Sequence, residues 1–438
     1  MKNKVNIGLI GIGTVGGGTY KVLHDNAEEI TRKTGKQVSI SHVADMNVEL
    51  AKKVVSDDTK IFSDAFQLVD DDTIDIIVEL IGGTTVSKDL VVRAIKNGKH
   101  VVTANKALIA IHGEELVALA KSNNVILAFE ASVAGGIPII KAIREGLVGN
   151  KIEWVAGIIN GTTNYILTEM RENRLSFQTA LKQAQELGFA EADPTFDIEG
   201  IDAAHKLTIL ASVSFGIPIN FDAVYIEGIS SLDSIDIGYA EELGYRIKLL
   251  AITKCHEDAV ELRVHPTLVP EKRLVANVNG PMNAVLVKGN MVGPTLYYGA
   301  GAGSEATASS VVADIIDIIR QSEINSEERV PVLGFKPEHI KPKRLLNINE
   351  VISEYYLRMT MSNMTGLLAR ITSIFAKHSI SIDAMTQKEV EENAKDVDII
   401  LITSPVIEEV MNKIINEIES LPENKNKIIK IRIESLNK

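Results

Sequence analysis

The strongest constraint on the fold is a glycine-rich turn near the N-terminus. Residues 5–10 (VNIGLI) are typical of a short buried strand, the turn GIGTVG follows at once, and residues 18–30 have helical spacing. Gly11, Gly13 and Gly16 match the pattern G-x-G-x-x-G. After a strand and before a helix, these glycines allow a tight turn, close approach of a pyrophosphate, and helix packing on the strand. The stretch predicts a dinucleotide site; the alternative is a tight turn without a ligand.

Strands and helices alternate through the next hundred residues. Apolar strand patterns occur at 38–45, 74–80 and 100–106, and helical patterns separate them at 88–98 and 113–124. Such alternation is typical of a parallel sheet with helices on both faces. We therefore expect an α/β fold that begins with a doubly wound, Rossmann-type parallel sheet.

The pattern changes after residue 130, and the rest of the chain divides into further units. Strand patterns with few intervening helices predict an α+β unit, a strongly apolar helix follows at 309–321, and a linker rich in proline and charge covers 327–350. Residues 354–438 read strand, helix, strand, strand, helix, strand, which predicts a small, separate unit. The expected domains are 1–129 (dinucleotide binding, completed by 301–325), 130–300 (substrate binding and dimerisation), 326–352 (linker) and 353–438 (regulatory).

Composition limits the class of protein. The 438 residues include 46 basic and 58 acidic side chains, and the net charge of -12 disfavours binding to nucleic acid or anionic membranes. No segment reaches the roughly 18 to 20 apolar residues of a membrane span, and the apolar N-terminal run breaks into glycines unlike a signal peptide. Cys255 is the single cysteine, so disulfides and cysteine-ligated metals are not expected. We expect a cytoplasmic protein without nucleic-acid or membrane partners.

A lysine within an apolar helix is the most informative single residue. In residues 197–210 (DIEGIDAAHKLTIL), apolar side chains are spread around the whole circumference, which is typical of a buried helix, and Lys206 lies among them. Asp202 precedes Lys206 by one turn on the same face. An exposed pair of this spacing would contribute only about 0.2–0.5 kcal/mol, but a buried lysine with a lowered pKa can exchange a proton with a developing alkoxide.

A second lysine and an aspartate follow predicted strands. Lys106 comes after residues 100–105, at the carboxyl edge where open α/β sheets bind ligands, and would reach a nicotinamide and a substrate there; the alternative is a surface lysine. Asp45 closes the second strand, where a carboxylate can accept from ribose hydroxyls, or simply cap a turn.

Several acids lie in the turn before the lysine-bearing helix and at its start. Asp197 and Glu199 fit the ordinary preference of acids for a helix N-terminus, and we assign them only that role. His205 is adjacent to Lys206 but points elsewhere on the helix, so we expect it to pack or to support the site indirectly.

Seven motifs occur in a distinctive order: GIGTVG, TANK, FEASVAGGIPII, INGTTNYIL, GFAEADP, DIEGIDAAHKLTIL and GAGAGSEATASS. With them the chain closely resembles the homoserine dehydrogenase family, from residue 1 to about 320. The resemblance implies oxidation of L-homoserine to L-aspartate 4-semialdehyde with NAD or NADP, or the reverse, in the biosynthesis of threonine, methionine and isoleucine. Other amino-acid or keto-acid dehydrogenases and a silent amino-acid sensor remain alternatives; a phosphorylating semialdehyde dehydrogenase would need a nucleophilic cysteine.

The resemblance also implies roles for individual residues. Lys206 would donate the proton to the aldehyde, Lys106 would assist beside the nicotinamide, and Glu191 and Asp202 would hold the substrate amino group and Lys206. Further residues fall where the family contacts the dinucleotide: Ile12, Gly13, Thr14, Val15, Lys106, Gly188 and Gly303. In FEASVAGGIPII the family binds a monovalent cation, Na⁺ or K⁺, through Glu130 and the backbone carbonyls of Val133, Gly135 and Ile137.

The residue before Asp45 bears on the choice between NAD and NADP. Many NADP-preferring members carry an arginine where this chain has Ala44, so the balance tilts slightly to NAD, although Lys52 or Lys60 would compensate for the missing guanidinium.

The C-terminal unit resembles an ACT domain, a βαββαβ module that binds amino acids, often between two copies. In this family it usually mediates feedback inhibition by threonine. The usual Asp-x-Pro-Gly loop reads Asn363-Met364-Thr365-Gly366 here, so threonine sensing and a purely oligomerising role both stay open. We expect a homodimer or homotetramer, and we expect that a chain lacking residues 350–438 would retain some activity.

Overall fold

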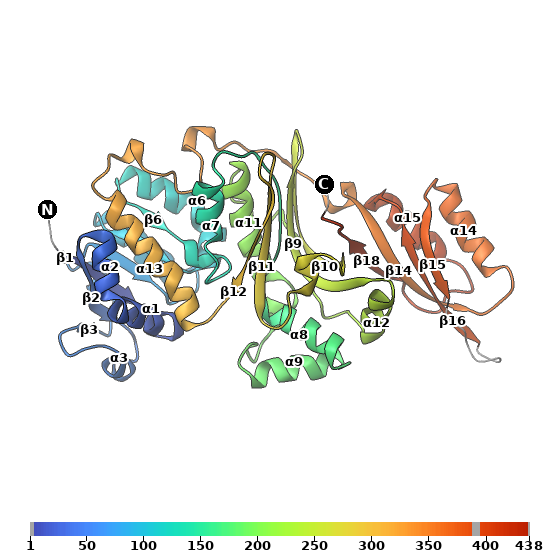
Figure 1. Cartoon of the computed structure of the whole chain (residues 1–438), viewed down its shortest axis with the longest axis horizontal. Coiled ribbons are helices and arrows are strands. Elements are labelled where there is room, and N and C mark those ends of the chain that lie inside the picture. The colour runs from blue at the N-terminus through green and yellow to red at the C-terminus, as the bar shows by residue number, and fades with distance from the viewer. Residues whose placement is uncertain (1–3, 388–394, 437–438) are drawn as a thin grey trace.

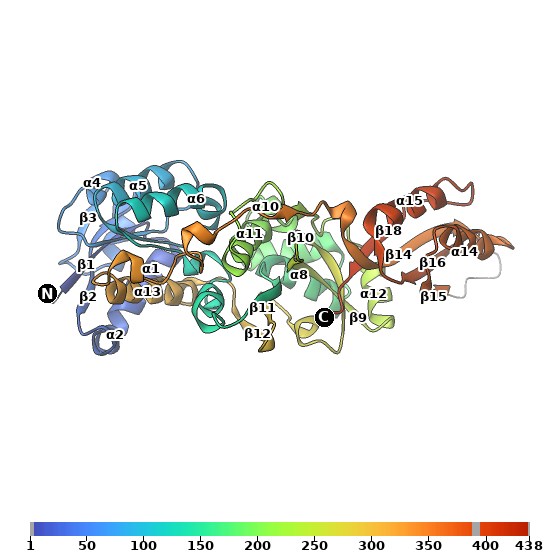
Figure 2. The ribbon, with the colours of Figure 1, turned by 90° about the horizontal axis from the view of Figure 1, so that it is seen from above.

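The computed structural model describes residues 4–387 and 395–436. Three units follow one another along the long axis of the molecule (Figure 1). The N-terminal unit lies at one end, the C-terminal unit at the other, and the middle unit connects them, an arrangement that the view from above repeats (Figure 2).

The N-terminal unit contains the expected parallel sheet. Its six strands have the order β3-β2-β1-β4-β5-β6, and every neighbouring pair is parallel. This order is that of a dinucleotide-binding sheet, so the doubly wound prediction is confirmed. The strands are β1 (Lys4–Ile10), β2 (Gln37–Ala44), β3 (Lys60–Phe62), β4 (Ile76–Glu79), β5 (His100–Thr103) and β6 (Leu127–Ala128).

Helices cover both faces of this sheet. They are α1 (Thr14–Asp25), α2 (Ala27–Thr34), α3 (Val48–Val54), α4 (Ala65–Val69), α5 (Val86–Lys96) and α6 (Lys106–Ser122). A seventh helix, α13 (Ser304–Gln321), returns from far along the sequence and packs against α1 (Figure 1). Residues beyond 300 therefore complete the core of the first unit.

The middle unit is built on a sheet whose strands have the order β12-β11-β7-β9-β10, all antiparallel. The strands are β7 (Ile152–Ile158), β9 (Tyr245–Cys255), β10 (Ala259–Pro270), β11 (Met282–Gly289) and β12 (Gly293–Ala300); β8 (Tyr225–Ile226) pairs with β10. The helices are α7 (Ile139–Lys141), α8 (Gly161–Glu172), α9 (Phe177–Glu186), α10 (Thr195–Ile198), α11 (Ile201–Phe215) and α12 (Ser234–Glu242).

The expectation of few helices between these strands is wrong. Helices α8 to α12 all lie between β7 and β9. Three of them begin at residues whose side chains accept from a backbone N–H of the first turn, namely Asn160, Ser176 and Asp233. Asparagine, serine and aspartate are favoured N-cap residues, so the sequence did contain signals for the starts of these helices. The prediction relied on the strand patterns and overlooked them.

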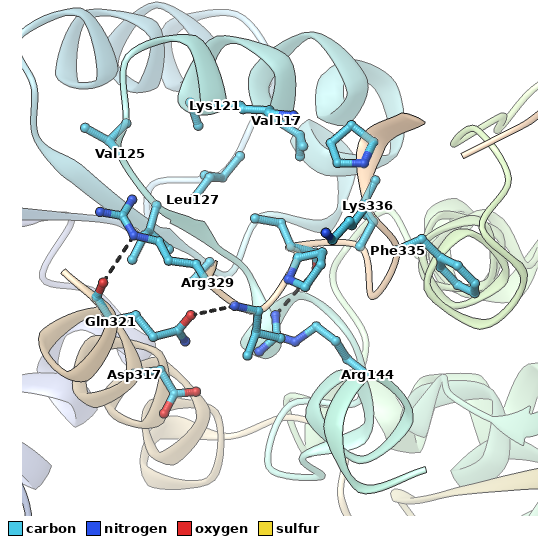
Figure 3. A pocket seen from close by; sticks show the side chains of 18 of the residues that line it. Val117, Lys121, Val125, Leu127, Arg144, Asp317, Gln321, Arg329, Phe335 and Lys336 are labelled. Atoms are coloured by element: carbon cyan, nitrogen blue, oxygen red, sulfur yellow. Dashed lines mark hydrogen bonds between the residues drawn. The ribbon is translucent and has the colours of Figure 1, made fainter. Parts of the chain in front are cut away.

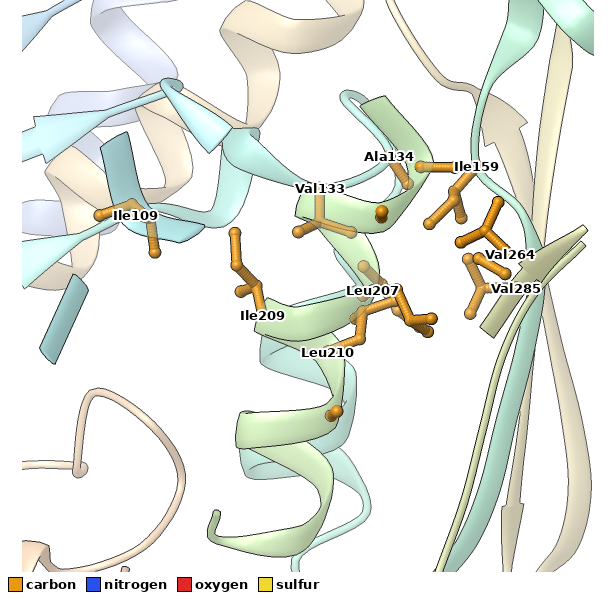
Figure 4. Close-up of a cluster of buried hydrophobic side chains, with 14 of the residues drawn as sticks. Ile109, Val133, Ala134, Ile159, Leu207, Ile209, Leu210, Val264 and Val285 are labelled. Atoms are coloured by element: carbon orange, nitrogen blue, oxygen red, sulfur yellow. The ribbon is translucent and has the colours of Figure 1, made fainter. Parts of the chain in front are cut away.

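Helix α11 lies at the centre of the largest apolar core. Leu207, Ile209 and Leu210 pack among side chains from the sheet and from the first unit, including Val264 and Ile109 (Figure 4). All residues from Asp202 to Ser214 are buried. The prediction that this helix is enclosed on all sides is confirmed.

The C-terminal unit has the expected βαββαβ order. It consists of β14 (Ile352–Ser362), α14 (Leu367–Lys377), β15 (Ile382–Gln387), β16 (Asp396–Thr403), α15 (Glu408–Glu419) and β18 (Ile429–Ile433), with an additional short strand β17 (Val406–Ile407). Its strands are ordered β18-β14-β16-β15. The linker before it contains the two-residue strand β13 (Arg344–Leu345), which pairs with β10.

The prediction that this unit is separate is wrong, because its sheet continues that of the middle unit. Strand β18 pairs in parallel with β10, so that Thr267 aligns with Arg432 and Leu268 with Ile433, and the two sheets become one. Arg263 on β10 is 1% exposed, and its guanidinium bonds the Glu434 carboxylate. Loss of residues 350–438 would therefore leave a buried guanidinium without this partner, so the truncated chain is expected to be unstable.

Within the described ranges, 4–387 and 395–436, no helix combines the length and the apolar character that a membrane crossing requires.

The interface between the sheets gives a test of stability. Glu434→Ala should lower the free energy of unfolding by about 3–5 kcal/mol, because it leaves the buried Arg263 without a principal counter-ion. Glu409→Ala is the control: its partner Lys413 and Glu409 itself are 58% and 61% exposed, and such pairs contribute about 0–1 kcal/mol. Denaturant unfolding followed by the fluorescence of Trp154, the only tryptophan, compares the two. Equal losses would contradict this account of the interface.

Candidate functional site

The glycine turn leaves room for a ligand where the sequence predicts one. Gly11 has φ +91°, and a Cβ on Gly16 would lie 1.9 Å from the Gly11 carbonyl oxygen, so both positions require glycine. A Cβ on Gly13 would meet nothing within 4 Å. Helix α1 begins at Thr14, and its N-cap residue, Gly13, supplies no side-chain cap. Its first backbone N–H groups therefore suit a pyrophosphate.

Asp45 ties the end of β2 to this turn. Its Oδ2 accepts from the backbone N–H of Ile12 at 2.8 Å, and its Oδ1 accepts from that of Asn47 at 2.7 Å. The two nearby lysines have acidic neighbours: Lys52 pairs with Glu49 at 2.7 Å, and Lys60 lies 3.9 Å from an aspartate carboxylate.

Gly303 lies beside the glycine turn although 290 residues separate them. It precedes α13, whose Ser304 Oγ donates to the Thr14 carbonyl oxygen at 2.9 Å. A Cβ on Gly18 would lie 2.5 Å from Ser304 Oγ, so α1 and α13 meet in close contact. Gly188, by contrast, belongs to the turn after α9 in the middle unit and has φ +75°.

Lys206 has an environment that fits a proton-exchanging group. The residue is 9% exposed, and its Nζ donates to Asp202 Oδ2 at 2.6 Å and to the Ile159 carbonyl oxygen at 2.7 Å. A lysine ammonium has three N–H bonds. These two contacts fix its direction and leave a third N–H for another acceptor.

Lys106 approaches the same carboxylate from the other domain. It is the first residue of α6, and its Nζ lies 3.0 Å from Asp202 Oδ1 and 5.6 Å from the centre of the Phe196 ring. Asn105 positions it: the Asn105 side chain caps α6 by accepting from the Leu108 N–H and donates to the Gly83 carbonyl oxygen. One buried carboxylate thus joins lysines of two domains.

This arrangement moves the two lysine pKa values in opposite directions. Burial lowers the pKa of Lys206, and the charge of Lys106 lowers it further, against the attraction of Asp202. The Asp202 carboxylate raises the pKa of Lys106 and outweighs burial there. For Asp202, burial acts to raise the pKa, but the two ammonium groups together hold it below its ordinary value. Divergent pKa values in one site are typical of groups with different acid–base roles.

Two residues that contact the site carboxylate or its neighbours were not predicted from the sequence. Asn160, 4% exposed, donates from Nδ2 to Asp197 Oδ1 at 2.7 Å and to Asp202 Oδ2 at 2.9 Å. Asp197 is therefore part of the charged cluster and not just a helix-start acid, and burial raises its pKa. The signal for Asn160 was its place as an N-cap directly after a strand; Asp197 had no distinguishing local signal.

The other acids and His205 surround the cluster. Glu191 is exposed in the turn before α10, and its charge contributes to the raised pKa of Lys106. His205 packs between the rings of Phe196 and Phe221, with centroid distances of 5.3 and 4.3 Å, and burial lowers its pKa to about 4. The expectation that His205 packs is confirmed.

The loop expected to hold a cation is closed by the protein itself. Both oxygens of the Glu130 carboxylate accept from backbone N–H groups, of Ile140 at 2.9 Å and Lys141 at 2.8 Å. The Gly135 carbonyl oxygen accepts from Ser310 Oγ at 2.6 Å, and both Ala134 and Gly135 have φ near +50°. The Glu130 carboxylate and the Gly135 carbonyl oxygen thus both accept hydrogen bonds from within the protein. The expected cation ligands, Glu130 and the backbone carbonyls of Val133, Gly135 and Ile137, are oxygens of the kind that suits a hard monovalent ion.

A cavity also lies beneath the linker, and neither Lys106 nor Lys206 lines it (Figure 3). Val117 and Leu127 line it on one side and Phe335 on the other. Arg329 reaches across it and donates to backbone carbonyls of residues 124, 321, 322 and 324. We interpret Arg329 as a clamp that holds the linker to the first unit.

Comparison with known families matches almost the whole chain. Residues 11–130 match the family model described as homoserine dehydrogenase, NAD binding domain, residues 138–316 match homoserine dehydrogenase, and residues 355–423 match the ACT domain. The chain is 53% identical to the homoserine dehydrogenase of Pseudomonas aeruginosa over 433 residues, which cover 99% of each protein.

Solved structures give the same result. The chain is similar to a homoserine dehydrogenase from Thiobacillus denitrificans, with TM-score 0.94, 55% identity and coverage of 99% of both chains. It is also similar to a hyperthermophilic archaeal homoserine dehydrogenase in complex with NADPH, with TM-score 0.62 and 28% identity over 73% of this chain and 98% of that one.

The open space at Gly13 can be tested directly. Gly13→Ala should fold normally, because its Cβ meets no protein atom within 4 Å, but should weaken dinucleotide binding by about tenfold or more by obstructing the approach of the phosphates. Gly17→Ala is the control, since its Cβ would make ordinary contacts at 3.6 Å. Fluorescence titration with NADH and NADPH measures both variants. Unchanged affinity in Gly13→Ala would place the pyrophosphate elsewhere.

Proposed function

The chain belongs to the homoserine dehydrogenase family and is an oxidoreductase with an NAD-binding domain, and from this premise we propose that Lys206 transfers the proton while Lys106 stays charged. The observation that carries the proposal is the single buried carboxylate, Asp202, shared by both lysines. The reaction interconverts L-homoserine and L-aspartate 4-semialdehyde.

The chemistry supplied by a bound dinucleotide is reversible transfer of a hydride at the substrate carbon that bears the hydroxyl. In the oxidising direction, the neutral amine of Lys206 accepts the hydroxyl proton while the C–H bond breaks and the C=O bond forms. In the reducing direction, the Lys206 ammonium donates the same proton to the new alkoxide. Burial lowers the pKa of Lys206, so the neutral form needed for oxidation is present at lower pH than for a solvated lysine.

Lys106 has the complementary role. Asp202 raises its pKa, so it remains an ammonium through the pH range in which Lys206 titrates, and it stabilises negative charge on the substrate oxygen. Glu191, exposed in the turn before α10, holds the substrate ammonium together with Asp202. Residues Ile12 to Val15, Asp45, Gly188 and Gly303 hold the dinucleotide.

NAD is the proposed preferred cofactor. The chain has Ala44 where an arginine would bind a 2′-phosphate, and Lys52 already pairs with Glu49. A monovalent cation, Na⁺ or K⁺, is proposed as a structural component of the loop from Glu130 to Ile137. Two consecutive residues with positive φ, Ala134 and Gly135, turn the backbone sharply there.

We further propose feedback inhibition by threonine through the ACT domain. A hollow lined by Asn363, Gly366 and Gln387 lies at the N-terminus of α14, and α14 has no side-chain cap. An amino-acid carboxylate suits such a helix N-terminus.

A chain of contacts joins this domain to the lysines. Arg432 of β18 bonds the Glu408 carboxylate within the ACT domain, and its Nη1 donates to Glu227 of the middle unit at 2.8 Å. The segment after Glu227 contacts helix α10: the Ile229 N–H donates to the Ile198 carbonyl oxygen at 2.8 Å, three residues before α11 begins.

Self-association is proposed through the middle unit. Strand β12 ends the sheet without a further strand among the described residues, and Tyr298 on it is 59% exposed. An open edge strand with exposed apolar groups is a common pairing surface, so we propose a homodimer or a homotetramer.

The proton-transfer role predicts a selective loss of turnover. Lys206→Ala should lower kcat for homoserine oxidation by about 10²- to 10⁴-fold, while NAD affinity stays within about twofold, since Lys206 is not among the residues proposed to hold the dinucleotide. Lys182→Ala, which changes a lysine 77% exposed on α9, serves as control. The rate of homoserine oxidation is followed by absorbance at 340 nm for the wild type, Lys206→Ala and Lys182→Ala, with NAD and NADP at equal concentrations. A Lys206→Ala enzyme that keeps most of its rate would refute the role.

The feedback proposal predicts an effect of Glu227. Glu227→Gln removes the charge that pairs with Arg432. It should raise the threonine concentration needed for inhibition about fivefold or more, the lower end of typical allosteric coupling free energies. Basal turnover should stay within about twofold. Glu409→Gln, on the exposed face of α15, should keep the wild-type response. Inhibition curves for the full chain settle the matter: no inhibition of the wild type would remove the regulatory proposal, and an unchanged curve in Glu227→Gln would remove this route.

A further inference from the structure

The junction between β7 and α8 carries a motif that the mechanism above leaves unused. Residues 159–163 (INGTT) follow β7 and begin α8. The first two residues of this junction face the buried lysine and its carboxylate partner. The Ile159 carbonyl oxygen accepts from Lys206 Nζ, and the Asn160 side chain contacts Asp202.

Every hydrogen-bonding position of the Asn160 amide is used. Its Oδ1 accepts from the backbone N–H of Thr163 at 2.8 Å and from Thr163 Oγ1 at 2.9 Å. Since the backbone N–H can only donate, the oxygen must face Thr163, and the amide NH₂ must face the carboxylates. The orientation of this side chain is therefore fixed by α8.

The two N–H bonds of Asn160 divide between two acids. One reaches Asp197 Oδ1 at 2.7 Å on α10, and the other reaches Asp202 Oδ2 at 2.9 Å on α11. Two carboxylates in a buried cluster repel each other, and a shared donor between them offsets that repulsion. Asp202 Oδ2 accepts from Asn160 and from Lys206 at once, so the amide also sets the plane of the carboxylate.

We propose that Asn160 is a positioning residue for the reaction: its amide holds the Asp202 carboxylate in the orientation that bridges Lys206 and Lys106, and ties it to helix α10 through Asp197. Asn160 acts through Asp202 and does not touch the substrate. The inference rests on the proton-transfer role proposed above for Lys206.

Two substitutions separate this role from helix capping. Asn160→Asp keeps an oxygen for the Thr163 N–H but replaces the donating NH₂ by a second oxygen, which adds negative charge beside Asp202. That charge raises the pKa of Lys206, so the acidic limb of homoserine oxidation should move to higher pH by about one unit. Asn160→Ser also keeps a capping oxygen, since serine is a favoured N-cap, but loses the amide bonds to the carboxylates.

The experiment is the pH dependence of kcat for homoserine oxidation in full-length variants, with saturating NAD and with thermal unfolding as a check of folding. Asn160→Ser should lose about tenfold or more in kcat, the size expected for lost hydrogen bonds to charged groups, with the KM for NAD within about twofold. Asn160→Asp should show the shifted limb. Ser176→Ala is the control, because it removes the cap of α9 without touching the cluster.

Each outcome decides the inference. A wild-type kcat in Asn160→Ser overturns it, because a capping role alone predicts that result. An unmoved limb in a folded Asn160→Asp also overturns it, because residue 160 would then exert no influence on the carboxylate that binds Lys206. Should Asn160→Asp not fold, the kcat of Asn160→Ser decides alone. Retention of activity in Lys206→Ala would instead refute the proton-transfer role, so the two failures are distinguishable.

Discussion

The structure depends on one buried carboxylate with two lysine partners. Asp202 comes from α11 of the middle unit, and it binds Lys206 of the same helix and Lys106 of the N-terminal unit. Removing one member of such a buried group costs about 3–5 kcal/mol, because the others lose their counter-charge. This contact between the two units is thus also the contact that sets the protonation of the site, and stability and chemistry are coupled at one residue.

The same principle recurs at the other end of the molecule. Arg263 and Arg432, each 1% exposed, lie on the neighbouring strands β10 and β18, and both pair with buried glutamates. Since an unpaired buried guanidinium is costly, the ACT domain and the middle unit are held in one register. Strands β18 and β8 both pair with β10, and the segment after β8 bonds Ile198 of α10, next to α11. This continuous path is the basis of the proposed regulatory route.

Much of the architecture follows from local sequence signals. The rest depends on contacts between residues far apart in the sequence, which leave no local signal. The glycine turn and the spacing of Asp202 and Lys206 are local patterns, so the parallel sheet and the buried pair were predictable. The pairing of β10 with β18 joins residues far apart in sequence, and such pairing has no local signature. Asp197 resembled an ordinary helix-start acid, because only the fold brings Asn160 against it.

The most direct test of the shared carboxylate is a titration of the lysines themselves. Nuclear magnetic resonance of ¹³Cε-labelled lysine, with the two signals assigned by Lys106→Met and Lys206→Met, reports each protonation separately. The account predicts that Lys206 loses its proton below the ordinary lysine range and Lys106 above it. Two signals that titrate together at the value of solvated lysines would contradict it.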